Sequence, residues 1–269
     1  MSQESDRAFD DLLGYIEREL DFESGFYNEA YLDRRITARM RRTDTDDYRT
    51  YKGLLEADDG EREQLLDSLS INVTGFFRNP DAWESLRGVL RDLTAKQRSV
   101  SIWSAPCADG REPYSIAMLA LDDDEIDARR VEVLGTDINR DILRTAREGR
   151  YETSQTTDIE SELEPLSTPD RWVDRDGDVF TVTDRVSDLV TFERHDLIRG
   201  REKRGFDLVL CRNLLIYIDA DYKVPIFETI TGSLAEDGYL MIGMTETLPS
   251  EFRGRYEAVE KQHRIYRRA

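Results

Sequence analysis

Apolar side chains recur three and four residues apart throughout the first 70 residues of the chain. This spacing gathers them on one face of an α-helix, so it predicts helices only in this part. Four groups of apolar residues show it: Ala8, Phe9, Leu12, Leu13 and Ile16; Leu32, Ile36 and Met40; Tyr48, Tyr51, Leu54 and Leu55; and Leu65, Leu66 and Leu69.

From about residue 97 onward, short apolar runs alternate with segments of helical spacing. The expected strands are Val100–Ser104, Val131–Thr136, Leu189–Arg194, Phe206–Cys211 and Tyr239–Gly243. The expected helices between them run through Ser115–Leu121, Asp141–Glu148 and Tyr222–Leu234. Such alternation predicts a mainly parallel sheet covered by helices on both faces. Two late segments, Tyr256–Val259 and His263–Tyr266, could close the sheet as an antiparallel edge pair.

One segment interrupts this alternation. Residues Trp172–Val186 contain the turn Asp176-Gly177 followed by alternating Phe180 and Val182, a pattern typical of a small β-hairpin. The expected organisation is therefore a helical domain over residues 1–75 and an α/β domain over residues 76–269, with a small β insertion at about 170–188.

The charge composition changes the picture of the surface. The 269 residues include 57 Asp and Glu against 38 Lys and Arg, a net charge of −19, and five of the 38 cations are lysines. An acidic, lysine-poor surface suits a high-salt cytoplasm, although an ordinary acidic protein is the alternative. Nonspecific binding of nucleic acid is disfavoured, because it needs a basic face.

Other functional classes are also disfavoured. No apolar run of about 18 residues is present, and the first 20 residues lack the pattern of a signal peptide, so we expect a cytoplasmic protein. Two cysteines, Cys107 and Cys211, cannot form a disulfide framework. With only His195 and His263 as imidazole ligands, a metal site is not expected.

Polar residues follow the expected strands. The segment 104–115 forms a turn of small residues that opens into a helix, Asp137 ends the second strand, and Arg212 and Asn213 follow the fourth. Open α/β sheets bind ligands at the carboxyl ends of their strands, where an acidic residue can accept ribose hydroxyls. These features predict a nucleoside cofactor, without separating a dinucleotide from S-adenosylmethionine.

Five longer motifs carry a family resemblance. They are INVTGFFRNPDAW (71–83), WSAPCADGREPYSIAML (103–119), GTDINRDILRTAREGRY (135–151), FDLVLCRNLLIYID (206–219) and GMTET (243–247). Together they resemble the CheR chemotaxis methyltransferases, in matching order over about residues 8–267. The resemblance implies a class I S-adenosylmethionine methyltransferase with a Rossmann-like, mainly parallel sheet, an all-α N-terminal domain and a small β-hairpin insertion. It also implies methyl transfer to glutamate side chains of methyl-accepting chemotaxis receptors, with S-adenosylhomocysteine as the product.

The same resemblance implies the site residues. Arg78 would orient the substrate carboxylate and Tyr217 would line the methyl pocket, although a surface arginine and a packed aromatic are the structural alternatives. The expected cofactor-binding residues are Asn72, Thr74, Arg78, Glu112, Asp137, Asp196, Leu197, Arg212 and Asn213. Pro106 in the cofactor loop and Asp196, where the family usually has Asn, depart from the family pattern and bear on cofactor affinity.

A cationic stripe in the helical domain is the candidate docking surface. Arg35, Arg39 and Arg42 follow one another beside the apolar face of YLDRRITARMRR (31–42). They could dock the acidic helical region of a receptor, which would bring the protein to the membrane only indirectly. A solvated face paired with local acids is the alternative. The short insertion predicts docking that is independent of a receptor-tail peptide.

Other functions remain open on the residues alone. They are an S-adenosylmethionine-dependent methyltransferase of another protein or small molecule, a nonenzymatic regulator that binds S-adenosylmethionine, and a dehydrogenase. The missing GxGxxG motif disfavours the dehydrogenase.

Overall fold

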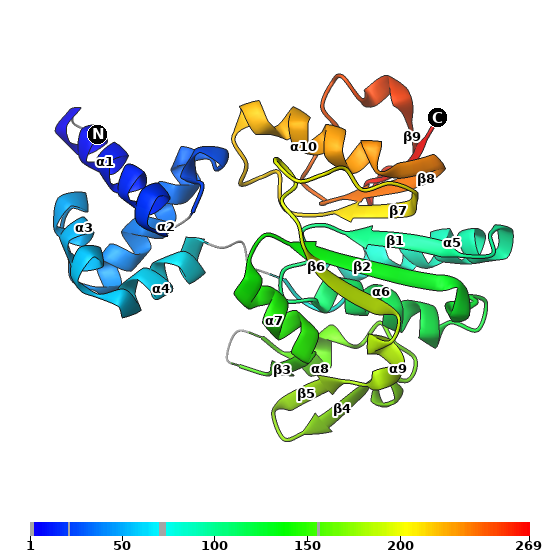
Figure 1. Cartoon of the computed structure of the whole chain (residues 1–269). Helices are drawn as coiled ribbons and strands as arrows, with labels where there is room; N and C mark the ends of the chain where they lie inside the picture. The colour runs from blue at the N-terminus through cyan, green and yellow to red at the C-terminus, as the bar shows by residue number, and fades with distance from the viewer. Residues whose placement is uncertain (1–2, 21, 70–73, 155–156) are drawn as a thin grey trace. The chain divides into compact units, whose positions relative to one another are not determined.

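The computed structural model describes residues 3–20, 22–69, 74–154 and 157–269, and these fall into two compact units (Figure 1). One unit comprises residues 1–71 together with 217–223, and the other comprises 72–216 and 224–269. None of the described helices is both long and apolar enough to cross a membrane.

The first unit is built from helices, as its apolar spacing predicts. They are α1 (Gln3–Leu20), α2 (Glu29–Arg42), α3 (Tyr48–Ala57) and α4 (Asp59–Leu69), with a short 3-10 turn at Ser24–Phe26. Asn28 and Asp47 begin α2 and α3 by accepting the N–H groups of Ala30 and Thr50. The apolar residues of each helix form one core, which includes Ile16, Ile36, Leu55 and Leu65.

A charged group lies inside this helical core. The guanidinium of Arg39 donates from both Nε and Nη2 to the carboxylate of Glu61, which also accepts the hydroxyl of Tyr51 at 2.6 Å. Arg39 and Glu61 are both buried. This corrects the expectation that Arg39 belongs to an exposed docking stripe, because its side chain is already bound within the unit. The pair holds α2, α3 and α4 together.

The second unit contains a seven-stranded sheet in the order β6-β2-β1-β7-β8-β10-β9. The strands are β1 (Val100–Ser104), β2 (Val131–Asp137), β6 (Val190–Arg194), β7 (Phe206–Cys211), β8 (Leu234–Ile242), β9 (Tyr256–Glu260) and β10 (Ile265–Arg268). Strands β6, β2, β1, β7 and β8 pair in parallel, while β10 is antiparallel to both β8 and β9. The expected strands are thus present, with β10 inside the sheet and β9 at its edge.

Helices of the second unit alternate with these strands along the chain. They are α5 (Pro80–Lys96), α6 (Arg111–Asp122), α7 (Arg140–Glu148), α9 (Asp184–Ser187) and α10 (Ala220–Gly232). Leu234 belongs to β8 rather than to the preceding helix, which ends two residues earlier. Apolar residues from the strands and from α5 and α6 form one large core, among them Ile102, Leu208 and Met118.

A small antiparallel sheet replaces the single hairpin expected in the insertion. Strands β4 (Val173–Asp176) and β5 (Val179–Val182) form that hairpin, and Gly177 takes a positive φ in its turn. The third strand, β3 (Arg150–Glu152), pairs with β5 on its other side. The short helix α8 (Ile159–Glu162) lies between β3 and β4 in the chain.

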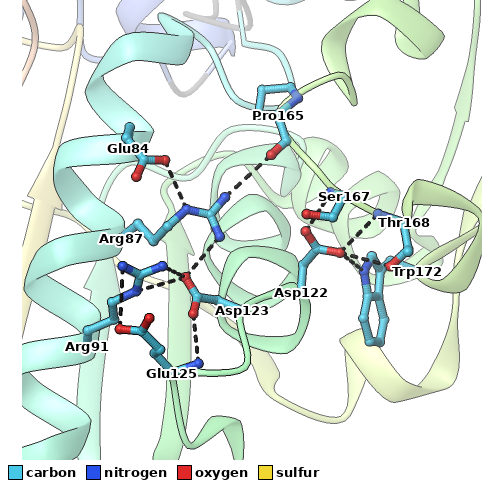
Figure 2. A network of polar contacts seen from close by, with 10 residues as sticks. All are labelled: Glu84, Arg87, Arg91, Asp122, Asp123, Glu125, Pro165, Ser167, Thr168 and Trp172. Atoms are coloured by element: carbon cyan, nitrogen blue, oxygen red, sulfur yellow. Dashed lines mark hydrogen bonds and ion pairs between the residues drawn. The ribbon is translucent and has the colours of Figure 1, made fainter.

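Two neighbouring carboxylates anchor the carboxyl end of α6 (Figure 2). Asp123 accepts Arg87 at 3.0 Å and Arg91 at 2.8 Å, so it ties α6 to α5. Asp122 accepts the backbone N–H groups of Ser167 and Thr168 and the indole N–H of Trp172. The two residues therefore join α5, α6 and the insertion.

Replacing Asp123 with Asn is expected to lower the free energy of unfolding at neutral pH by about 1–3 kcal/mol, because the buried Asp123 carboxylate is the charged acceptor that Arg87 and Arg91 share. Burial acts to raise the pKa of the Asp123 carboxyl, but Arg91, the Glu125 N–H and Arg87 outweigh it and hold the pKa below its ordinary value. The contribution is thus present above the pKa of the unfolded chain and is lost as the pH falls through the folded value. Urea unfolding at neutral pH and near pH 3 measures it; an equal difference at both would contradict the prediction.

Candidate active site

The carboxyl ends of four parallel strands meet at one edge of the sheet. Ser104 of β1 is in register with Gly135 of β2 and with Leu210 of β7, and Cys211 of β7 is in register with Ile242 of β8. The segments that follow these strands consequently lie along the same edge. They contain the polar residues that the sequence singled out.

Asp137 joins the first two of these segments. Its carboxylate accepts the N–H of Ala108 at 3.0 Å and the N–H of Asn139 at 3.0 Å, and its side chain is buried. Burial raises the pKa of the Asp137 carboxyl above its ordinary value, and the backbone N–H groups only partly offset that effect. A buried carboxylate at this edge is suited to accepting further hydrogen bonds from the hydroxyls of a ribose.

The loop between β1 and α6 approaches its neighbours closely. Gly110 has φ of +90° just before α6, and a Cβ there would lie 3.0 Å from both the Cα of Ala146 and the ring of Phe192. Only glycine meets both the backbone conformation and the space. α6 begins directly after Gly110, in the same loop whose Ala108 N–H is bound by the Asp137 carboxylate.

Arg212 links three residues near this edge of the sheet. Its guanidinium donates to Glu112 at 3.2 Å, to the backbone carbonyl of Arg78 at 2.9 Å and to the side chain of Asn79 at 3.1 Å. Only 1% of its side chain is exposed. Protein groups enclose the side chain, but its Nε is buried without a hydrogen-bond partner among the described residues, and its role in cofactor binding stays a prediction.

Glu112 is held between two partners. One carboxylate oxygen accepts the hydroxyl of Ser104 at 2.9 Å, and the other pairs with Arg212. Its side chain is 12% exposed. Glu112 thus links β1, α6 and the segment after β7 at the same edge.

The segment just before α5 has an unusual backbone conformation and is held by hydrogen bonds. Phe77 and Asn79 both have positive φ, and the Phe77 N–H is bound by the hydroxyl of Ser115 at 3.0 Å. Between them, the carbonyl of Arg78 accepts the indole N–H of Trp83 in addition to Arg212. Arg78 and Thr74 are half-buried. Asn72, which the family motif includes, lies outside the described residues.

Asp196 and Leu197 follow β6, next to β2. The carboxylate of Asp196 accepts the N–H groups of Ile198 and Arg199, at 2.8 and 3.1 Å, and so closes its own turn. The preceding residue, His195, donates its N–H to the carbonyl of Asp137 at 3.0 Å. This places the turn beside Asp137, while the adenine-binding role of Asp196 and Leu197 stays a prediction.

Tyr217 belongs to the helical unit. Its ring packs 4.9 Å from that of Tyr31, and its carbonyl accepts the N–H of Asn28 at 2.8 Å. The guanidinium of half-buried Arg35 lies over the same Tyr31 ring, 5.4 Å from its centre, whereas Arg42 is exposed. Of the three predicted docking arginines, Arg42 is therefore exposed, Arg35 is half-buried and Arg39 is buried.

Sequence reasoning missed three residues near the described edge of the sheet. Ile138, directly after Asp137, is 41% exposed and offers an apolar surface suited to a nucleobase. Glu162 of α8 accepts the N–H of Phe76 and pairs with Arg111. Glu246 lies in GMTET, which the sequence singled out without assigning it a role. The sequence did offer a signal for Ile138, since an apolar residue directly follows the acid expected to bind the ribose. It offered no signal for Glu162.

The polar groups at this edge fit a nucleoside cofactor. Asp137 supplies buried acceptors for ribose hydroxyls, and Ile138 supplies an exposed apolar surface beside them. Among the described residues, no three His, Cys, Asp or Glu side chains are grouped so that they could hold a metal ion.

Comparison with known proteins identifies the family. Residues 72–265 match the family model described as "CheR methyltransferase, SAM binding domain", and residues 7–70 match "CheR methyltransferase, all-alpha domain". A probable chemotaxis protein methyltransferase of Rhizobium etli is 36% identical, covering 81% of this chain and 84% of the relative. Chemotaxis protein methyltransferases of Listeria monocytogenes and Borreliella burgdorferi are 31% and 29% identical, covering 87% of both chains in the first case and 81% and 80% in the second. The chain therefore belongs to the CheR methyltransferase family, and its larger unit carries the S-adenosylmethionine-binding domain of that family.

Proposed function

We propose that this protein transfers a methyl group from S-adenosylmethionine to glutamate side chains of methyl-accepting chemotaxis receptors. The observation that carries the proposal is the buried Asp137 carboxylate at the carboxyl edge of a sheet that matches the family's S-adenosylmethionine-binding domain. The names of the relatives support a role in chemotaxis. The products are a glutamyl methyl ester and S-adenosylhomocysteine, and the cellular setting is the cytoplasm.

The reaction needs little acid–base chemistry from the protein. The sulfonium of S-adenosylmethionine supplies an activated methyl group, and a glutamate is already ionised near neutral pH. The residues of this chain therefore bind, orient and exclude water. We assign ribose binding to Asp137, and orientation of the substrate carboxylate to Arg78, which also contacts the cofactor. Tyr217 forms the wall of the methyl pocket. The other cofactor contacts are assigned to residues of the surrounding loops: Asn72, Thr74, Glu112, Asp196, Leu197, Arg212 and Asn213.

The helical domain, residues 1–75, is assigned to receptor docking. α2 carries three exposed arginines, Arg34, Arg41 and Arg42, and the half-buried Arg35. They give this helix a cationic surface on a chain whose net charge is −19. An acidic helical region of a receptor complements that surface. Arg39 is left out, because Glu61 binds it in the core. The acidic, lysine-poor composition supports a halophilic source.

Incubation with methyl-labelled S-adenosylmethionine and receptor-enriched membranes in high salt tests the proposal. The expected result is label in the receptors that mild base releases, because methyl esters are base-labile. Label that resists base, or that enters other molecules while the receptors stay unlabelled, would contradict it.

Asp137→Asn is expected to weaken binding of S-adenosylhomocysteine by about 1–3 kcal/mol, because a buried acceptor is replaced in part by a donor. Calorimetry measures this.

The affinity of the parent protein should also depend on pH. Hydrogen bonds from ribose hydroxyls favour the ionised carboxylate, whereas burial raises its pKa in the free protein. Affinity should therefore fall as the pH falls through that raised pKa, and binding in that range should release a proton. Calorimetry in buffers of different ionisation enthalpy detects the proton; a pH-independent affinity down to about pH 4 would contradict the assignment.

Ile138→Ser is expected to weaken S-adenosylhomocysteine binding several-fold while leaving the melting temperature nearly unchanged, because the side chain is exposed in the free protein and covered by the cofactor. Val259→Ser is the matched control, since Val259 is 51% exposed and lies on β9 at the far edge of the sheet. An equal effect of both substitutions on the measured Kd would remove Ile138 from the site.

Replacing Arg41 and Arg42 together with glutamine is expected to raise the KM for receptor at working salt and to leave S-adenosylmethionine binding unchanged, because both side chains are exposed on α2. Arg39→Gln is the contrasting variant. It should lower the melting temperature, since it leaves Glu61 buried without its cation. Receptor kinetics identical to those of the parent would show that the arginines are only a solvated surface.

A further inference from the structure

Glu246 is a buried carboxylate in the turn that follows β8. It is only 3% exposed. Its carboxylate accepts three backbone N–H groups, from Gly243 at 2.6 Å, Leu215 at 2.7 Å and Asn213 at 3.1 Å. No ion pair of Glu246 occurs within the part of the chain that the structure describes, so these N–H dipoles are its stabilising partners there.

The three donors belong to the ends of two neighbouring strands. β7 ends at Cys211 and β8 at Ile242, and these two residues are in register. Beyond them the backbone N–H groups no longer have partners in the ladder, yet Leu215 and Gly243 are buried. Because buried N–H groups need acceptors, a single side chain that reaches both strand ends fixes the two segments to each other.

The segment that Glu246 holds includes a residue in an unfavourable backbone conformation. Asn213 has φ of 59°, in the left-handed region that side chains other than glycine rarely adopt. Its own N–H and that of Leu215, two residues later, are both bound by Glu246. At Gly243, a Cβ would lie 2.5 Å from the Glu246 carboxylate and 2.8 Å from the Asn213 nitrogen, so the packing leaves no space for a side chain.

Arg212, the residue before Asn213, is held by different contacts. Arg212 is fixed through its side chain by Glu112, whereas Asn213 is fixed through its backbone by Glu246. Adjacent positions of one segment are therefore constrained independently. Removing the Glu246 contacts leaves the hydrogen bonds of the Arg212 side chain in place.

We propose that Glu246 is a positioning residue, which holds the backbone of Asn213–Leu215 so that the Asn213 side chain meets S-adenosylmethionine in its binding geometry. The inference rests on the proposed contact between Asn213 and the cofactor. Burial also raises the pKa of the Glu246 carboxyl, and the N–H groups of Gly243, Leu215 and Asn213 offset this only in part.

Glu246→Gln tests the proposal, because the amide has the same size but exchanges one acceptor oxygen for a donor. Asp122→Asn is the matched control. Asp122 also accepts two backbone N–H groups, those of Ser167 and Thr168 (Figure 2). It is the last residue of α6, whereas the cofactor loop precedes the first. Both substitutions should lower the melting temperature. Only Glu246→Gln should raise the Kd of S-adenosylhomocysteine, by about tenfold.

A double-mutant cycle separates positioning from general destabilisation. If Glu246 acts through Asn213, then Glu246→Gln added to Asn213→Ala should weaken binding little beyond Asn213→Ala alone. A Kd for Glu246→Gln within twofold of the parent, equal effects of Glu246→Gln and Asp122→Asn, or effects on binding that add in the double variant would each overturn the proposal.

Gly243→Ala serves if Glu246→Gln does not fold, since the added Cβ displaces the carboxylate while keeping its charge. It should also weaken S-adenosylhomocysteine binding about tenfold, and unchanged binding would overturn the proposal. A parent protein that does not bind S-adenosylhomocysteine would instead contradict the proposed function.

Discussion

Backbone N–H groups beyond the carboxyl ends of the parallel strands need acceptors, and buried carboxylates supply them. Asp137 binds the N–H groups of Ala108 and Asn139 after β1 and β2, and Glu246 binds those of Asn213, Leu215 and Gly243 after β7 and β8. Ionised carboxylates are costly to bury, and their raised pKa values express that cost. The loops of the site are consequently shaped by the same groups that terminate the sheet.

Internal arginines form the second set of constraints. Arg212 joins Glu112 of α6 to the carbonyl of Arg78, which lies between two residues of positive φ. Such backbone persists only where the surroundings over-determine it. The junction segment and the segment after β7 are therefore held in place before any ligand binds, which lowers the entropic cost of binding.

The charge of the chain is distributed unevenly between surface and interior. Although acids outnumber bases by 19, several arginines are enclosed with carboxylate partners, as Arg39 is with Glu61 and Arg87 with Asp123. These pairs cross-link helices from different parts of the chain. Arginine suits this role, because its planar guanidinium donates several hydrogen bonds at fixed angles. The arginines left exposed on α2 are thus the ones available to an acidic partner.

Local pattern by itself determined the helical faces of α1–α4, the strands β1, β2, β6 and β7, and the β4–β5 hairpin, because residues near in sequence decide each of them. It also placed Asp137, Arg212 and Asn213 at strand ends, and the motifs indicated the family. Tertiary structure alone decided the features that depend on distant partners. The three residues of β3 become a strand only beside β5, Arg39 is buried only because Glu61 meets it, and Tyr217 joins the helical unit through Asn28 and Tyr31. Glu246 likewise acquires its partners only when β7 and β8 end side by side, since a hydrogen bond between residues about 30 positions apart leaves no periodic trace in the sequence.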